Sequence, residues 1–140
     1  MTRIGHRRRL IQTAQISISM PWLPTKYSFQ FLSYKPGKAG EAYGIINDHF
    51  APAGAAAGLP GPVVIHFQSG AWDASFHWRL EDGLADLEWR RSPNDVAFRA
   101  ALVAQEGSED AADEIFDRYN SLIARTSTVI GHRHVSEDEE

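Results

Sequence analysis

The sequence predicts an α+β domain: an antiparallel meander of five to six strands followed by two C-terminal helices packed on one sheet face. Several segments between residues 15 and 89 carry an apolar side chain at every second position, the period of half-buried strands. Beyond residue 92 the apolar spacing changes to three and four, the period of an amphipathic helix. A sheet face and a helix stripe that are both apolar can cover each other, which favours a two-layer arrangement.

The strand period is clear in residues 15–20, 27–31 and 63–68, where apolar and polar side chains alternate. Each of these segments should therefore bury one face. A turn rich in Lys, Gly and Pro spans residues 35–40, and we expect the following residues 41–47 to form the next strand.

Asp82 and Gly83 predict a two-residue hairpin turn, because a type I′ turn needs positive φ at both central positions. Counting outward from this turn places apolar pairs on one sheet face and charged pairs on the other, which should set the register. The apolar pairs are Leu80–Ala85, Trp78–Leu87 and Phe76–Trp89, and the charged pairs are Arg79–Asp86 and His77–Glu88.

Two helices follow the predicted hairpin. Ser92 is expected to cap the first, with a proline at its first position and Asp95 in its first turn. Gly107 should end that helix near residue 105, and Ser108 should cap the second. The second helix is expected to extend through Thr126, with an apolar stripe formed by Ile115, Phe116, Tyr119, Leu122 and Ile123.

Residues 48–62 are rich in Ala, Gly and Pro, and at about fifteen residues they are long for a connection in a compact domain. Such a loop is either a mobile insertion or a lid over a pocket, in which case His49 and Phe50 would contact the ligand. Trp22 and Trp72 lie in turns between predicted strands, where they either anchor a partner or fold back over the sheet edge.

The chain is expected to contain one domain at residues 10–127, between a basic arm at 1–9 and a tail at 128–140 with histidines and acids. The tails are interpreted as solvated segments of opposite sign. A weaker hypothesis is a nucleic-acid contact through the arginines of the arm, which are Arg3, Arg7, Arg8 and Arg9.

Composition excludes several functional classes. The formal net charge of −4 argues against a surface built for nucleic acid or anionic membranes. The absence of cysteine excludes disulfides and thiolate metal sites. No apolar run approaches the length of a membrane span and no signal peptide is evident, so we expect a cytoplasmic protein without a membrane partner.

His66, His77 and Glu88 are the weak candidates for catalysis or a metal site. If strand 63–68 pairs with strand 75–81 and shares its apolar face, all three lie on the polar face, where they could act as metal ligands or as an acid–base pair. A solvated polar sheet face explains the same residues more simply. His132 and His134 form a second, weaker metal candidate in the tail, and no cofactor is expected.

Local catalytic and phosphate-binding motifs are absent from the sequence, which favours a non-enzymatic function. The first hypothesis is therefore a binding or assembly protein that forms a homo-oligomer or binds a protein partner, of the kind found in bacteria or phages. The alternative is a small-molecule binding protein or enzyme, with a pocket between sheet and helices closed by residues 48–62.

Replacing Gly83 by valine should lower the melting temperature more than any single substitution of an outward-facing residue in the same segment. The reason is that a β-branched side chain resists the positive φ expected at this position. Thermal unfolding of Gly83→Val beside Arg79→Ala measures the difference, and equal melting temperatures would contradict the prediction.

Overall fold

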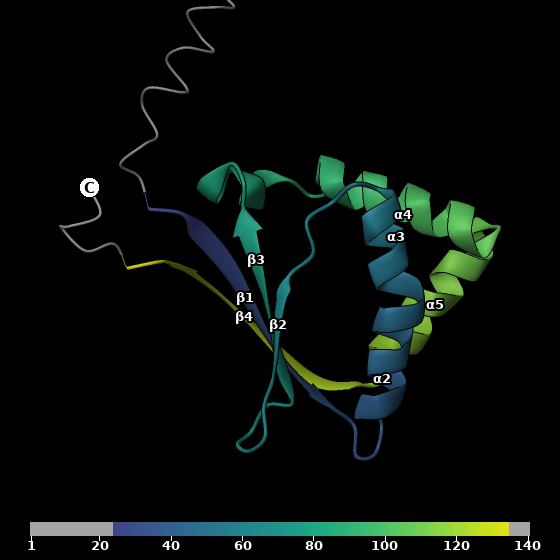
Figure 1. The fold of residues 1–140 in the computed structure, drawn as a ribbon, viewed down its shortest axis with the longest axis horizontal. Helices are drawn as coiled ribbons and strands as arrows, with labels where there is room; N and C mark the ends of the chain where they lie inside the picture. The colour runs from purple at the N-terminus through teal and green to yellow at the C-terminus, as the bar shows by residue number, and fades with distance from the viewer. Residues whose placement is uncertain (1–23, 135–140) are drawn as a thin grey trace, which may run out of the picture.

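The computed structural model describes residues 24–134, in which helical segments are interleaved between strands (Figure 1). In chain order the elements are β1 (Lys26–Tyr34), α2 (Ala39–Ile45), η1 (Ile46–Phe50), α3 (Ala51–Ala56), β2 (Val63–His66), β3 (Ala74–Leu80), η2 (Gly83–Glu88), α4 (Pro93–Glu106), α5 (Glu109–Ser121) and β4 (Ile123–His132). The strands form one antiparallel sheet in the order β2-β3-β1-β4. This β-α-β-β-α-β order along the chain is the ferredoxin-like arrangement.

The α+β class and the antiparallel sheet are confirmed, but the predicted meander is wrong. The described residues form a sheet of four strands rather than five or six. β1 pairs with β3 and β4, both distant in sequence, and helices separate it from the strands that follow. Helices therefore do not come only at the C-terminal end, although α2, α3, α4 and α5 all lie on one side of the sheet (Figure 1).

The predicted strand at 41–47 and the predicted loop at 48–62 are both wrong, because residues 39–56 form the helical run α2-η1-α3. The apolar residues that face the core follow the helical period: Ala42, Ile45, Ile46, Phe50 and Ala53. Several Gly and Pro residues within the run hid this period in the sequence. Because Ala53 is buried in the core, the segment is a scaffold element and not a lid.

The middle of this run, η1, is a π-helical turn. The Ala51 N–H donates to the carbonyl oxygen of Ile46, one residue further back than in an α-helix. Pro52 follows directly and has no N–H to donate, so the regular hydrogen-bond pattern must change near it. The wider turn lets the chain remain helical through this proline.

The predicted hairpin at Asp82-Gly83 is wrong, because residues 83–88 form the 3₁₀ helix η2 and Trp89 lies beyond it, outside any strand. Gly83 does have positive φ, at 61°, but the chain continues into a helical turn. The segment is rich in residues that are depleted in strands, namely Ala, Asp and Glu. Leu84 and Leu87 are three residues apart, which matches the 3₁₀ period, and both remain exposed.

The predicted helix caps after residue 91 are confirmed. Ser92 and Asp95 form a reciprocal capping box, with side chain to backbone distances of 3.1 and 2.9 Å. Gly107 ends α4 in the left-handed conformation at φ 96°, and Ser108 caps α5. The helix expected to reach Thr126 instead ends at Ser121.

A strand follows α5 directly, and it was not predicted. Residues 126–130 are Thr, Ser, Thr, Val and Ile, a run rich in β-branched side chains that favours a strand. β4 includes residues 128–132, which were expected to begin the tail, and it pairs along the whole of β1.

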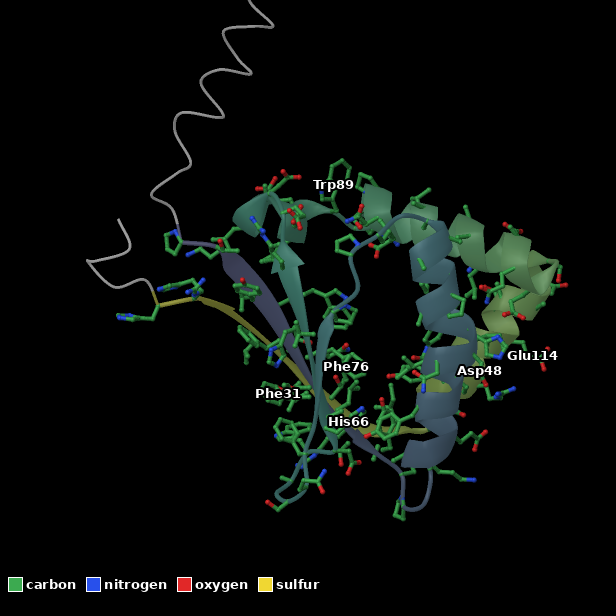
Figure 2. The ribbon with its side chains drawn as sticks, in the orientation of Figure 1. Phe31, Asp48, His66, Phe76, Trp89 and Glu114 are labelled. Atoms are coloured by element: carbon green, nitrogen blue, oxygen red, sulfur yellow. The ribbon has the colours of Figure 1, made fainter. Side chains whose placement is uncertain are left out.

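The register of β1 and β3 assigns their side chains to the two sheet faces. Leu32 pairs with Ala74, and Gln30 pairs with Phe76, so these residues point to one face. On that face Leu32, Tyr34, Ala74 and Phe76 are buried against α2 and α5. Figure 2 shows Phe76 on the helix side of the sheet and Phe31 on the opposite side, which none of the described helices covers.

A second core cluster lies among the helices themselves. Ala53 of α3, Leu102 of α4 and Ala112 of α5 are fully buried there, with phenylalanine rings packed around them. No helix within residues 24–134 combines the length and apolar character needed to cross a membrane. Four features of the sequence analysis lie outside the described residues: the predicted strand 15–20, the arginine arm at 1–9, Trp22 and the acidic end of the tail at 135–140.

Replacing Ser92 by alanine should reduce the free energy of unfolding by about 1 kcal/mol, because the Asp95 N–H at the start of α4 loses its acceptor. Chemical denaturation measures the loss. Ser92→Asp is the matched control, since its carboxylate can still cap the helix, and it should unfold close to wild type. Equal loss in both variants would show that the cap does not stabilise α4.

Candidate functional site

The sheet face away from the helices, here called the open face, is largely apolar on β1, β2 and β4, whereas β3 contributes Ser75, His77 and Arg79 to it. Its apolar side chains are Tyr27, Phe29, Phe31, Val63, Ile65, Phe67 and Val129, with Trp72 beside them. Val63 is 61% exposed, Val129 is 49%, Ile65 is 43% and Phe67 is 37%. A sheet face of this kind is usually polar when it faces water.

Aromatic rings on the open face pack against one another at the end near the β2–β3 loop. Phe31 stacks with Phe67 at 6.3 Å between ring centroids and contacts Trp72 at 5.8 Å. The Arg125 guanidinium lies 4.4 Å from the Trp72 ring centroid and donates to the carbonyl oxygen of Ala71 at 2.9 Å. Trp72 is therefore held on the open face by these contacts.

Ser75 and His77 form the polar centre of the open face. Ser75 is only 1% exposed, and its Oγ lies 2.8 Å from Nε2 of His77. The His77 ring also meets the Phe29 ring edge-on, at 4.8 Å between centroids. These two contacts hold the imidazole in one orientation within apolar surroundings.

A pocket of about 280 Å³ opens beside His77. It lies toward the start of β1 and the end of β4, where Tyr27, Val63 and His132 contribute to its walls. None of the four strands contains an aspartate or glutamate, although the chain as a whole is acidic. The charged side chains within the strands are Lys26, Arg79 and Arg125.

The structure does not bring His66, His77 and Glu88 together. His66 pairs with Ala74 and His77 with Val63, so the two imidazoles point to opposite faces. Both histidines were expected on the polar face, but β2 and β3 pair in a register that places the apolar sets of the two strands on different faces. Glu88 lies in η2 instead of a neighbouring strand.

His66 lies on the helix side of the sheet, where its ring meets that of Tyr43 at 4.4 Å (Figure 2). His132 ends β4 and His134 follows it, and both are exposed. Within residues 24–134 no group of three or more His, Asp or Glu side chains is placed to hold a metal ion.

His49 and Phe50, the residues expected on a lid, instead join helices. His49 Nδ1 lies 2.5 Å from Glu106 Oε1, and Gln105 donates to the His49 carbonyl oxygen at 3.1 Å. Hydrogen bonds from Gln105 and from His49 lower the pKa of the Glu106 carboxyl below its ordinary value. The Phe50 ring packs on Phe116 at 5.4 Å, so both residues have structural contacts.

The sequence analysis missed a buried tyrosine cluster between the sheet and the helices. The hydroxyls of Tyr34 and Tyr119 lie 2.9 Å apart, and Tyr43 packs edge-on against Tyr34. Burial is the main cause that raises the pKa of all three phenols. The Tyr34 N–H also donates to Asp73 at 2.7 Å. No local motif could identify this cluster, because Tyr34 and Tyr119 are 85 residues apart.

The buried tyrosines should make the protein less stable at high pH. The pKa of a tyrosine in the unfolded chain is about 10, and the pKa of these tyrosines in the folded protein is higher, so the unfolded chain loses the proton first. The free energy of unfolding should therefore be unaffected by these groups below about pH 10. It should fall as the pH rises from that value toward the folded pKa. Titration of phenolate absorbance in the ultraviolet tests this. In the folded protein, Tyr34→Phe should show the same absorbance increase just above pH 10 as wild type, because Tyr34 does not ionise there. In denaturant the variant should show a smaller increase than wild type. A smaller change in the native protein would show that Tyr34 ionises normally.

Solved structures with a similar fold include two NIPSNAP family proteins from Agrobacterium tumefaciens. One is 12% identical with a TM-score of 0.53, and the match covers 79% of this chain and 87% of that chain. The other, a protein of unknown function, is 14% identical with a TM-score of 0.52, over 79% of this chain and 88% of that one. No family model and no curated protein matches the sequence. At such low identity the likeness shows a shared fold and nothing about activity.

Proposed function

We propose that this is a small assembly protein whose copies pair through their open faces. The observation that carries the proposal is the apolar character of a sheet face that none of the helices within residues 24–134 covers. Contiguous apolar surface on a folded domain marks an interaction site more often than a solvated face. Removing a Val, Ile or Phe side chain from water stabilises a complex by up to about 1.5–3 kcal/mol each, so several such residues supply a substantial driving force.

The distribution of charge supports a second copy as the partner. Arg79 pairs with Tyr27 and Arg125 with Ser33, so the two arginines lie toward opposite ends of the face. Between them the strands present mainly apolar side chains, together with Ser75, Ser127 and the imidazole of His77. This resembles the apolar core and charged rim of protein interfaces.

Self-pairing also suits the shape of the face. Most homo-oligomers use a two-fold axis, which brings the same patch of both subunits together. Two sheets can stack face to face at about 10 Å, with the side chains of both inner faces interdigitating.

Light scattering after size-exclusion chromatography should give a mass of twice the 15.6 kDa chain at high protein concentration, decreasing on dilution. Val129→Asp should dissociate the pair, because the interface would then bury an unpaired carboxylate. Phe67→Asp, further along the same face, should have the same effect.

Val96→Asp is the matched control for Val129→Asp. Val96 is 52% exposed and Val129 is 49% exposed, but Val96 lies on α4, away from the open face. The control should retain the wild-type mass. A wild-type protein that stays at 15.6 kDa at every concentration would overturn the proposal, and so would dissociation by Val96→Asp alone.

A further inference from the structure

The described helices cover only part of the sheet face on which they pack. Phe76 is 5% exposed, whereas Trp78, two residues further along β3 on the same face, is 36% exposed even though its ring stacks on that of Phe76. Ser28 pairs with Trp78 in β3 and with Ile130 in β4, so these three residues form one row across the sheet. The cover provided by the described helices therefore ends between Phe76 and this row.

Large apolar side chains are exposed beyond that limit. Val64, Trp78 and Ile130 define this area, here called the uncovered patch. Val64 pairs with Phe76, which places it on the same face in β2. Trp89, between η2 and α4, adds an exposed ring at this end of the molecule (Figure 2). A contiguous apolar area on a folded domain indicates a contact with another segment or chain.

The segment that precedes β1 is unusually poor in charge. Residues 10–25 contain no charged residue, although 23% of the whole chain is charged. Segments that stay solvated usually combine low hydrophobicity with high charge, and this composition is the opposite. Ile16, Ile18 and Met20 alternate with polar residues, so an extended chain would present them on one side. These side chains gain stability only if an apolar surface covers them.

This segment joins the described fold at the same end as the uncovered patch. Residue 24 is the first described residue, and Lys26, which begins β1, pairs with Leu80 at the end of β3. Residue 24 and Ser28 are separated by four residues, about 13 Å along an extended chain. Pro21 and Pro24 favour a turn before β1, which would direct the preceding residues back over the sheet.

The size of the uncovered patch matches one extended segment. Trp78 and Ile130 lie two strand spacings apart, about 10 Å, and an extended chain from Ile16 to Met20 spans about 13 Å. The open face is larger, because its apolar side chains lie in several rows along the strands. One segment with three apolar side chains could cover the row at Ser28, but it would leave most of the open face exposed.

We propose that residues 10–23 fold back within the same chain and pack on the uncovered patch, with Ile16, Ile18 and Met20 against Trp78 and Ile130. In this arrangement the segment extends the helix layer over the part of the sheet nearest η2. The inference goes beyond the pairing proposal and does not depend on it, because the uncovered patch and the open face lie on opposite sides of the sheet.

Photocrosslinking of the full chain tests this contact. With p-benzoylphenylalanine in place of Ile130, irradiation should join this position to residues 10–26. Trypsin releases those residues as a single peptide, because Arg9 and Lys26 bound an interval without other Lys or Arg, and mass spectrometry identifies it. The same probe in place of Trp78 gives a second measurement from β3 and should join to the same peptide.

Val129 is the matched control position. It neighbours Ile130 in β4 and is similarly exposed, at 49% against 40%, but it lies on the open face. A probe at Val129 should give no crosslink to residues 10–26. Equal crosslinking from positions 129 and 130 would overturn the proposal, and so would probes at Trp78 and Ile130 that do not reach this peptide.

A mixture of isotopically labelled and unlabelled chains identifies which chain supplies the segment. Crosslinks within one chain carry a single isotope composition, whereas crosslinks between copies also give mixed products. Mixed products would show that a second copy covers the patch and would overturn the proposal. Within-chain crosslinks should persist in Phe67→Asp, because this substitution changes only the open face. They would support the inference whatever mass is measured for pairing.

Two substitutions in the segment test whether its alternation determines the contact. Ile18→Asp should reduce the crosslink yield from position 130 about tenfold or more, because a buried carboxylate without a partner is strongly unfavourable. Ser17→Asp is the matched control, since the neighbouring residue belongs to the polar side of the alternation, and it should retain the yield of the unsubstituted segment. Equal loss in both variants would contradict the proposed packing.

Discussion

The pairing of β1 with both β3 and β4 is the constraint on which the rest of the structure depends. Side chains alternate between faces along a strand, so the parity of the register assigns every residue of the sheet to the helix side or the open side. With Leu32 opposite Ala74, the buried set is Leu32, Tyr34, Ala74 and Phe76. The same register sends Phe29, Phe31 and His77 outward, which creates both the open face and its pocket.

The described helices pack on one face of the sheet and do not cover the open face. α2 and α5 bury the first core cluster against the sheet, and α3, α4 and α5 form the second cluster among themselves. The contacts of His49 with Glu106 and of Tyr34 with Tyr119 join segments that are distant in sequence across these layers. The helices α2 to α5 thus pack on one side of the sheet, and no helix of residues 24–134 covers the aromatic residues of the other side.

The candidate site could be predicted only in part. The alternation of Tyr27, Phe29 and Phe31, and of Val63, Ile65 and Phe67, correctly groups residues that share a face. We expected these residues to face the helices, and that expectation is wrong. Both faces of the sheet carry apolar side chains, and alternation within a strand does not indicate which set of side chains meets the helices. His77 was considered as a metal ligand or acid–base residue beside His66 and Glu88, whereas its contacts are with Ser75 and Phe29.

The sequence alone determined the features that depend on neighbouring residues. These include the capping box at Ser92, the helix end at Gly107, the positive φ of Gly83 and the face-sharing sets within each strand. Only the tertiary structure decided which strands pair, which face the helices cover and that residues 39–56 are helical. The physical reason is that these outcomes depend on burial between segments far apart in sequence. The local pattern of residues 39–56, with its several Gly and Pro residues, becomes a helix because Ala42, Ile45 and Ala53 are buried there.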